Sequence, residues 1–386
     1  MAVDQAELSA FQWPTPTSAY VHVPFCRHRC GYCNFSVLAD RDDLMESYLD
    51  AVDAELSALE SPAVQTVFIG GGTPTHLPID ALDRLLQIVT NRLQLSDDFE
   101  WSVEANPEDI TDEKLDCLVA HGINRISLGM QSFHDAKLAG LERGHSGAGG
   151  AAVIRQVAEV IRNVSIDLIF AAPGETATQW RDDLQMALSL PIQHLSTYAL
   201  TFEKGTSFWS RRLRGELSAA DESVEIDMYQ AARQMTADAG LQQYEVSSFA
   251  KPAARCRHNL AYWDGLGWYA AGPGAARFVD GRREVNHRST TTYLKRMRGG
   301  LSPVAESDAI TVQQYARERA AFGVRQIDGV DLDRIHRETG IDIRGMCADM
   351  IQRSTDEQLL EEADGLIRLT QRGVLFADTV AGRFLD

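Results

Sequence analysis

Three cysteines within eight residues have the spacing of a metal-cluster loop. Cys26, Cys30 and Cys33 follow the pattern C-x3-C-x2-C. Thiolates at this spacing on one loop can bind three irons of a cubic 4Fe-4S cluster, and no fourth cysteine lies nearby to bind the last iron. An iron without a protein ligand is open to a small molecule, whereas structural metal sites normally have four protein ligands. The spacing therefore predicts a reactive cluster.

Two other interpretations fit these cysteines by spacing alone. One is a zinc site completed by His22 or His28, because cysteine and histidine clusters are often zinc sites. The other is three unrelated buried thiols. The remaining cysteines, Cys117, Cys256 and Cys347, are scattered along the chain and are predicted to be packing residues.

Short apolar segments rich in β-formers alternate with longer amphipathic segments from residue 19 onward. This alternation predicts repeated βα units and a buried parallel sheet. Six strands are predicted, at residues 19–23, 66–69, 100–104, 125–129, 165–170 and 194–200, with intervening helices that include 44–59, 79–93 and 112–121. Six units do not close an eight-stranded barrel. The expected fold class is therefore α/β, an incomplete (β/α)6 barrel open on one side.

Residues of distinctive chemistry lie at the end of each predicted strand. The cysteine loop follows the first strand, and the Gly-Gly-Gly-Thr run at 70–73 follows the second. Glu104 ends the third strand, Gln131 follows the fourth, Asp167 lies in the fifth and Tyr198 near the end of the sixth. Because the carboxyl ends of the strands build the active site in βα barrels, we expect these residues to converge.

The pattern changes in the last third of the chain. A helix is predicted at 221–238 and a strand at 243–247, while 147–152 is predicted to be a short flexible stretch. Helices followed by two short strands around a turn within 365–376 predict a small α+β winged-helix-like domain. The predicted organisation is an N-terminal extension at 1–18, a partial barrel at 19–250, a connecting region at 251–304 and the C-terminal domain at 305–386.

Charge and hydropathy exclude two classes of partner. The net charge of -18, with ten arginines against sixteen carboxylates in the C-terminal domain, argues against a nucleic-acid binder. No apolar run approaches the length that spans a bilayer, and the first residues lack the pattern of a signal peptide. Clustered thiolates suit a reducing compartment, so a cytoplasmic location is predicted.

Several motifs together resemble a known family. The cysteine loop with Tyr32, followed by the glycine run, resembles the radical S-adenosylmethionine (SAM) superfamily. The segments YVHVPFC, EANP, GMQSF, DLI and YEVS, which begin at residues 20, 104, 129, 167 and 244, resemble the oxygen-independent coproporphyrinogen oxidase-like family. The resemblance extends from about residue 20 to the C-terminus. It implies a radical SAM barrel whose cluster binds SAM and reduces it to a 5'-deoxyadenosyl radical.

The resemblance also implies a set of SAM contacts, namely Tyr20, Tyr32, Gly71, Gly72, Thr73, Glu104, Gln131, Arg143 and Asp167. The glycines and Thr73 are expected to bring backbone amides close to the methionyl group, although a tight strand-to-helix turn would also use glycine. Glu104 is expected to accept hydrogen bonds from SAM, the alternative being a capping or ion-paired carboxylate. Arg143 and Asp167 could equally form ordinary ion pairs. No catalytic residue is assigned.

Two departures from the oxidase pattern favour a different branch of the family. The oxidases have a further cysteine two positions after the third cluster ligand, where this chain has Phe35, and a longer segment before the cluster than the 25 residues here. The element H-N-x-x-Y-W at 258–263 is characteristic of heme-binding members. The resemblance therefore implies a heme chaperone that delivers heme to apo-hemoproteins such as respiratory enzymes. The alternative is a coproporphyrinogen III oxidase or another tetrapyrrole-modifying enzyme.

In that branch the heme-binding candidates are His258, Tyr262 and Trp263. His258 could ligate the iron, Tyr262 would lie on the same helical face to pack against the porphyrin, and Arg255 and Arg257 could meet the propionates. A histidine satisfied by hydrogen bonds beside aromatic packing residues is an equal alternative. The expected partners are heme or a porphyrin and an apo-hemoprotein acceptor, and a homodimer is compatible with this interpretation.

Overall fold

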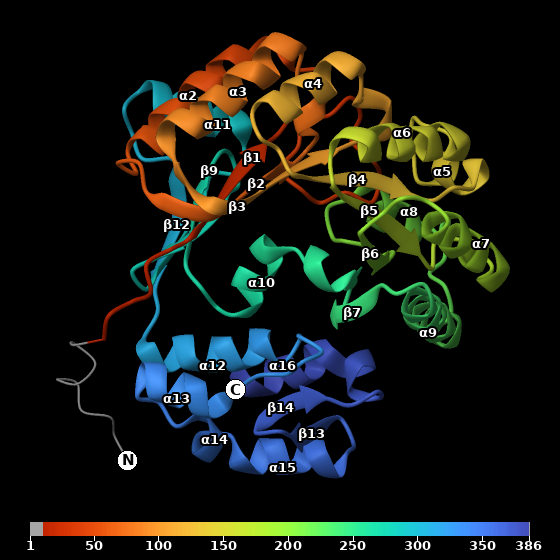
Figure 1. Ribbon diagram of the computed structural model, residues 1–386, viewed down its shortest axis with the longest axis vertical. Coiled ribbons are helices and arrows are strands. Elements are labelled where there is room, and N and C mark those ends of the chain that lie inside the picture. Colours follow the sequence, from red (N-terminus) through yellow and green to blue (C-terminus); the bar gives the residue numbers. More distant parts are fainter. Residues whose placement is uncertain (1–10, 386) are drawn as a thin grey trace.

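A curved sheet of twelve strands forms the centre of the protein in the computed structural model, which describes residues 11–385 (Figure 1). The first ten residues of the predicted extension at 1–18 lie outside the described residues. Along the sheet the strands have the order β12-β11-β10-β9-β1-β2-β3-β4-β5-β6-β8-β7. Consecutive neighbours from β1 to β6 reflect repeated βα connections between parallel strands, the topology that the alternating sequence predicts.

Six parallel strands form the core of this sheet at the six predicted positions. They are β1 (Ser18–Val23), β2 (Ala63–Gly71), β3 (Gln94–Ala105), β4 (Arg125–Gln131), β5 (Asn163–Phe170) and β6 (His194–Ala199). A seventh parallel strand that the sequence did not predict, β9 (Trp268–Ala271), pairs with the free side of β1. The six predicted units are thus confirmed, and the connecting region adds to the same sheet.

Both edges of the sheet are antiparallel. Strands β10 (Ala276–Val279), β11 (Arg282–Asn286) and β12 (Val304–Ala309) extend one edge, and β8 (Ser248–Ala250) and β7 (Gln242–Glu245) extend the other. The predicted strand at 243–247 is present as β7 but ends at Glu245, because the chain turns there and pairs with itself through β8. Strands β11 and β12 escaped prediction because their faces at this edge are largely polar or exposed, so they lack an apolar run.

Helices cover the outer face of the parallel strands, with α2, α3 and α4 side by side above β1 to β3 (Figure 1). They are α2 (Met45–Ser57), α3 (Ile79–Arg92), α4 (Asp112–Ala120), α5 (Asp135–Gly140), α6 (Gly147–Val160), α7 (Ala177–Leu188), α9 (Glu222–Asp238) and α11 (Thr290–Arg298). Helix α8 (Ser207–Leu213) instead packs against the cysteine loop. The prediction of a flexible stretch at 147–152 is wrong. These residues start α6, where a side chain at Gly147 would collide with the Phe133 carbonyl.

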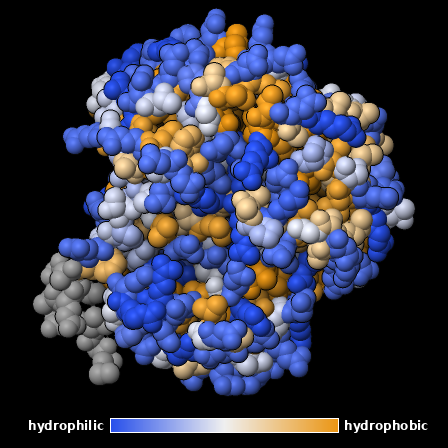
Figure 2. Space-filling view, viewed as in Figure 1, coloured by the Kyte–Doolittle hydropathy of each residue, from blue (hydrophilic) through white to orange (hydrophobic). Residues whose placement is uncertain are grey.

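Side chains alternate along the strands between an apolar outer face, which packs against the helices, and a polar inner face, which lines cavities. On β1, Ala19, Val21 and Val23 are buried against the helices, and on β5 Ile166 and Leu168 are buried in the same way. The opposite face is dominated by polar residues, including serines on β4, β5 and β6, that line cavities. A closed barrel fills its interior with bulky branched side chains, so small polar residues there leave space for a ligand. Outside, the helices present mainly hydrophilic surfaces with apolar side chains in the recesses (Figure 2).

A separate layer of helices lies below the open side of the barrel, with α10 (Arg257–Trp263) between the two (Figure 1). Its elements are α12 (Val312–Gly323), α13 (Leu332–Thr339), α14 (Ile343–Met346), α15 (Ala348–Asp356), β13 (Leu360–Ala363), β14 (Leu366–Leu369) and α16 (Ala377–Leu385). Helices and a hairpin give the predicted winged-helix-like arrangement. The hairpin was predicted too late in the chain, because it turns at Asp364 and Gly365, both with positive φ. Residues 373–376 form a 3-10 helix instead.

No helix among the described residues is long and apolar enough to cross a membrane.

A buried carboxylate on α2 joins the first βα unit to the late strands. Glu55 is 5 % exposed and accepts hydrogen bonds from the Gly272 amide at 2.9 Å, Asn286 Nδ2 at 2.7 Å and the Tyr293 hydroxyl at 2.7 Å. Glu55 therefore attaches three points of the segment from β9 to α11 to α2.

Replacing Glu55 by alanine should lower the free energy of unfolding by about 3 kcal/mol, because three buried donors lose their acceptor. Urea denaturation followed by circular dichroism measures this loss. Glu46→Ala is a matched control on the same helix, since Glu46 has an exposed side chain and forms a surface ion pair with Arg84. Equal losses in the two variants would contradict the assigned role of Glu55.

Candidate functional site

The cysteine loop leaves β1 and is closed at its base by backbone hydrogen bonds. The Cys26 amide donates to the Leu38 carbonyl at 2.9 Å, and the Leu38 amide donates to the Pro24 carbonyl at 2.7 Å. Inside the loop the Cys33 amide donates to the Cys30 carbonyl at 3.0 Å, which forms a turn. The loop therefore holds its three thiols at the end of β1, the barrel position that the sequence predicts.

The middle of the loop is fixed from the opposite side of the barrel mouth. The Gly31 amide donates to Glu142 at 2.7 Å, and the Phe208 amide donates to the Gly31 carbonyl at 2.8 Å. A β-carbon at Gly31 would lie 2.5 Å from the Phe208 ring, so the close packing of α8 requires glycine there. These contacts orient Cys30 toward the interior.

The three thiols of the loop are half-buried and form no disulfide. A cube of four irons binds each thiolate at a different corner, so three thiolates can hold three of its irons. Burial raises the pKa of Cys26 to about 12 and also raises that of Cys33, so metal binding must release their protons.

The two histidines considered as zinc ligands have other partners. The ring nitrogens of His22 lie 3.0 Å from the Tyr20 hydroxyl and 2.9 Å from the Ser36 carbonyl. His28 Nε2 lies 3.4 Å from the Glu142 carboxylate at the surface. These contacts give no support to the zinc interpretation.

A cavity of about 390 Å³ lies beside the cysteine loop at the carboxyl ends of the strands. All three cysteines and all but one of the predicted SAM contacts line it, the exception being Tyr20. These lining residues are Cys26, Cys30, Cys33, Tyr32, Gly71, Gly72, Thr73, Glu104, Gln131, Arg143 and Asp167. The strand-end residues thus converge as the barrel topology predicts.

Arg143 connects the cysteine loop to the end of β3. Its guanidinium lies 3.6 Å from Cys30 Sγ and donates to Asn106 Oδ1 at 2.5 Å. Asn106 Nδ2 in turn donates to Thr73 Oγ1, which lies 3.7 Å from Cys26 Sγ. Arg143 is therefore positioned beside the Cys30 thiol and the Asn106 amide, and within residues 11–385 it forms no ordinary ion pair and its buried Nε has no hydrogen-bond partner. Asn106 was not predicted as a site residue, although it lies within the EANP motif.

The glycine run approaches the cysteine loop through its backbone amides. The Gly72 and Thr73 amides donate to the carbonyls of Val23 and Phe25 at 2.7 and 2.8 Å, and the Gly71 amide donates to a carboxylate on β3. In this structure the three amides are therefore bonded within the protein, and their expected approach to a methionyl group stays a prediction. Glycine is required at position 72 because a β-carbon there would lie 2.6 Å from the Phe25 carbonyl oxygen. The run fixes the loop and keeps its side of the cavity open.

Two carboxyl groups face the interior from β3 and β5, the strands on either side of β4. Glu104 accepts the Gly71 amide at 2.9 Å, and Asp167 accepts the Ser127 hydroxyl at 3.2 Å. Burial and the nearby Asp167 raise the pKa of Glu104 to about 7, and burial raises the pKa of Asp167 to about 6. Their donors are an amide and a hydroxyl, so both groups remain able to accept hydrogen bonds from a cationic or hydroxylated ligand.

A break in the β4–β5 pairing turns Gln131 into the cavity. The register shifts between Leu128 and Gln131, and Gln131 has φ of +63°. Such a backbone conformation is unfavourable for a residue other than glycine and is common at functional sites. A β-carbon at Gly129 would approach Gln131 Nε2 to 3.0 Å, so the glycine provides room for this side chain.

A second cavity of about 700 Å³ lies between the inner face of the sheet and α10. It adjoins the first cavity, with which it shares Asn34, Phe35, Glu104, Ser127, Asp167 and Tyr198. Phe35 and Tyr198 are 58 % and 46 % exposed at this junction. The remaining predicted residues, Tyr20, His258, Tyr262 and Trp263, line the second cavity. Further aromatic side chains there are Phe68, Trp268 and Phe322.

Both ring nitrogens of His258 have hydrogen-bond partners. Nδ1 lies 2.9 Å from the Thr66 hydroxyl and Nε2 lies 2.8 Å from the Tyr262 hydroxyl. Burial lowers the pKa of His258 to about 3, so the ring is neutral, as a metal ligand must be. This geometry matches the satisfied histidine that the sequence left as an alternative, and iron ligation would require breaking one of these hydrogen bonds.

The aromatic residues of α10 have different surroundings. Tyr262 packs edge-on against Trp268 at 4.7 Å between ring centroids, inside the second cavity. Trp263 lies between that cavity and a smaller one, which is lined by the end of α10 and by the C-terminal domain. The Arg325 guanidinium lies 5.2 Å from the centre of the Trp263 ring. Tyr262 is therefore the better placed of the two to contact a bound ring.

The predicted propionate partners Arg255 and Arg257 do not line either large cavity. Their guanidinium groups pair with Asp328 at 2.6 Å and Asp98 at 3.2 Å, because the turn into α10 directs both side chains outward. This expectation is wrong. Arg288 was missed, although it lines the second cavity from the β11–α11 connection and is exposed there.

The fold and the cysteine pocket define a radical SAM protein. The family model described as Radical SAM superfamily matches residues 20–187, and the model of the HemN C-terminal domain matches residues 310–376. A solved structure of coproporphyrinogen III oxidase (HemN) from Escherichia coli covers 99 % of this chain and 93 % of its own with a TM-score of 0.84. At 21 % sequence identity this match shows a shared fold.

Relatives that match over nearly their full length identify the family within this superfamily. The chain is 32 % identical over 374 residues to the heme chaperone HemW of Bacillus subtilis, covering 95 % of this chain and 99 % of the relative. It is 36 % identical over 378 residues to the heme chaperone HemW of Mycobacterium tuberculosis, covering 96 % and 95 %. The chain therefore belongs to the HemW family within the radical SAM superfamily.

Replacing Cys30 by alanine should abolish a stable 4Fe-4S cluster, because two thiolates remain on the loop. Iron and sulfide content and visible absorbance after anaerobic reconstitution measure the loss. Cys347→Ala, in the C-terminal domain, is the matched control and should retain the cluster. Unchanged absorbance in the Cys30 variant would refute the ligand assignment.

The Glu104 carboxyl should make the stability of the metal-free protein depend on pH. Its pKa rises from 4.5 to about 7 on folding, so the folded state binds this proton more tightly than the unfolded state. The resulting stability is present below pH 4.5 and is lost as pH rises toward 7, by about 3 kcal/mol. Chemical denaturation at pH 5 and pH 8 should show a smaller difference in Glu104→Gln than in wild type. Glu46→Gln is the surface control, and equal pH dependence in all three proteins would contradict the assignment.

Proposed function

We propose that this protein is a heme chaperone that binds heme, a 4Fe-4S cluster and SAM and delivers heme to apo-hemoproteins. The observation that carries the proposal is the full-length similarity to proteins named heme chaperones, together with the roomy aromatic cavity beside the cysteine pocket. The two adjoining cavities provide separate space for the small cofactor and for a flat apolar ring. A volume of about 700 Å³ lies within the usual range for ligand pockets.

In the first cavity Cys26, Cys30 and Cys33 would ligate three irons, and SAM would bind the fourth. When bound, the cluster supplies one electron to the sulfonium of SAM. The chain's own contribution is electrostatic and steric: Arg143 places positive charge beside Cys30, where thiolate charge accumulates. Its unpartnered buried Nε is available to an anionic ligand, which supports the fit of this pocket to a cluster with a carboxylate-bearing ligand.

The carboxyl groups and the strained glutamine would orient SAM. Glu104 and Asp167 face the cavity with oxygen atoms available to an amino group or a ribose hydroxyl. Gln131 extends into the same space from its bulge. Tyr32 lines the pocket from the loop, and Tyr20 reaches the interior near Glu104 from the second cavity. These contacts would hold the cofactor in one orientation before any electron transfer.

Heme would occupy the second cavity with its ring against aromatic side chains. Phe35 and Tyr198 project at the junction, and Tyr262 faces the same space from α10. His258 is the candidate axial ligand through Nε2, which would exchange its hydrogen bond to Tyr262 for iron. Trp263 would pack beside the heme site on α10. Arg288, which also lines this cavity, is the candidate partner of a heme propionate.

Transfer would require an apo-hemoprotein to reach this cavity. The strongly acidic chain suits a protein acceptor better than nucleic acid. Free cysteines that must remain reduced suit the cytoplasm, where we place the activity. A homodimer stays a prediction of the sequence.

Oxidative decarboxylation of coproporphyrinogen III is the second candidate function. It is favoured by the fold match to HemN along 99 % of the chain and by a cysteine pocket that retains the predicted SAM positions. Phe35 in place of the further cysteine favours the chaperone, because a bulky exposed aromatic group changes the surface that a substrate would meet.

An anaerobic assay distinguishes the two functions. The reconstituted protein is incubated with SAM and a low-potential reductant, and with either heme or coproporphyrinogen III. We expect heme to bind unmodified and to move to an apo-hemoprotein, and His258→Ala to weaken heme binding at least tenfold. His134→Ala, whose ring contacts a backbone carbonyl outside both cavities, is the matched control. Formation of 5'-deoxyadenosine in step with vinyl groups would refute the chaperone function.

A further inference from the structure

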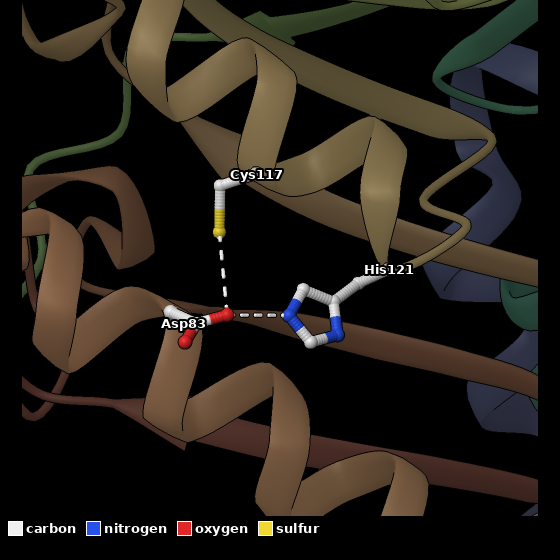
Figure 3. A group of neighbouring side chains, drawn as sticks. All are labelled: Asp83, Cys117 and His121. Atoms are coloured by element: carbon white, nitrogen blue, oxygen red, sulfur yellow. Dashed lines mark hydrogen bonds and ion pairs between the residues drawn. The ribbon is translucent and has the colours of Figure 1, made fainter.

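A group of metal-binding side chains lies outside both cavities, on the helical layer that covers the sheet. Asp83 on α3, Cys117 on α4 and His121 at the end of α4 point toward one another (Figure 3). One ligand atom from each lies within 4.8 Å of the other two, the one such group of three found in the described part of the chain. We propose that these residues bind one Zn²⁺ ion that joins α3 to α4.

The local structure explains why these three side chains meet. Cys117 and His121 are four residues apart, so both project from one face of α4. Helices α3 and α4 pack side by side against the sheet, and Asp83 projects from α3 toward that face. The site is thus formed by two rigid elements rather than by a flexible loop, which favours a stable coordination geometry.

The donor set has the chemistry that zinc prefers. Thiolate, imidazole and carboxylate are its usual protein ligands, and three protein ligands with one open position form a four-coordinate site. Asp83 Oδ1 lies 3.9 Å from Cys117 Sγ, which fits the separation of about 3.5 Å between neighbouring ligands of a tetrahedral zinc ion. His121 Nε2 lies 2.6 Å from Asp83 Oδ1, so this pair would separate by about 1 Å around the ion.

The surroundings leave room for the fourth ligand and orient the carboxylate. The side chains of Asp83 and His121 are 44 % and 17 % exposed, so water can reach the ion. Gln87, one turn further along α3, donates to the other carboxylate oxygen of Asp83 at 2.6 Å. Such an outer hydrogen bond typically fixes a metal-bound carboxylate and raises affinity.

Without metal the same residues form an ion pair between Asp83 and His121 with a thiol beside it. The ion pair accounts for the positions of Asp83 and His121 but gives no role to Cys117, because a surface ion pair needs no cysteine. The prediction that Cys117 is only a packing residue would then hold. A metal explains all three, together with the convergence of the sulfur on the same carboxylate oxygen that the imidazole contacts.

Zinc retention by the cluster-loaded protein tests the proposal. The protein is reconstituted anaerobically so that the cysteine loop is occupied, exposed to a small excess of Zn²⁺, desalted and analysed for metal. We expect one zinc per wild-type chain, and at least a tenfold loss of affinity in Cys117→Ser and His121→Ala. Replacing Zn²⁺ by Co²⁺ should give a thiolate-to-cobalt absorption band that Cys117→Ser lacks.

Controls separate a specific site from general effects. Cys347→Ser and His336→Ala, both in the C-terminal domain, should retain one zinc and the cobalt band. Gln87→Ala leaves the three ligands in place and should weaken zinc binding about tenfold, which keeps the test informative if a ligand variant unfolds. Equal zinc retention by wild type and Cys117→Ser would overturn the proposal. Wild-type, cluster-loaded protein that retains no zinc would overturn it as well.

Discussion

The close approach of the glycine run to the cysteine loop is the constraint on which the rest of this structure depends. The Gly72 and Thr73 amides bind carbonyls at the end of β1, and a β-carbon at Gly72 would meet the Phe25 carbonyl at 2.6 Å. These contacts hold the loop over the strand ends, and Thr73 continues the connection through Asn106 to Arg143. The cysteine loop is therefore held against the sheet by hydrogen bonds between backbone atoms. Substituting side chains of the loop would leave these hydrogen bonds in place.

The polarity of the inner sheet face determines what the barrel can hold. Its outer face packs aliphatic residues against helices, while serines and carboxyl groups on the inner face leave two adjoining cavities. Removing water from Glu104 and Asp167 raises the pKa of each, a cost that the fold tolerates where a ligand would compensate it. Phe35 stands at the junction of the cavities, at the position that separates this chain from the oxidases.

Helix α10 illustrates where motif-based prediction reaches its limit. The H-N-x-x-Y-W element predicted a heme ligand with arginine partners, and in the structure His258 and Tyr262 line the second cavity. Both ring nitrogens of His258 form hydrogen bonds in the structure. The side chains of Arg255 and Arg257 point away from the cavity and pair with Asp328 and Asp98. A motif gives residue types and spacing, but hydrogen-bond partners come from distant segments such as Thr66, 192 residues away.

The amino-acid sequence by itself determined the six βα units, the ligand pattern of the cysteines and the strand-end residues, because each depends on local periodicity or short spacing. Tertiary structure alone decided the polar edge strands, the attachment of late strands through Glu55, and the role of the glycine amides. It also brought Asp83 to Cys117 and His121 from a separate helix. These features depend on contacts between residues far apart in the chain, whose geometry no local pattern specifies.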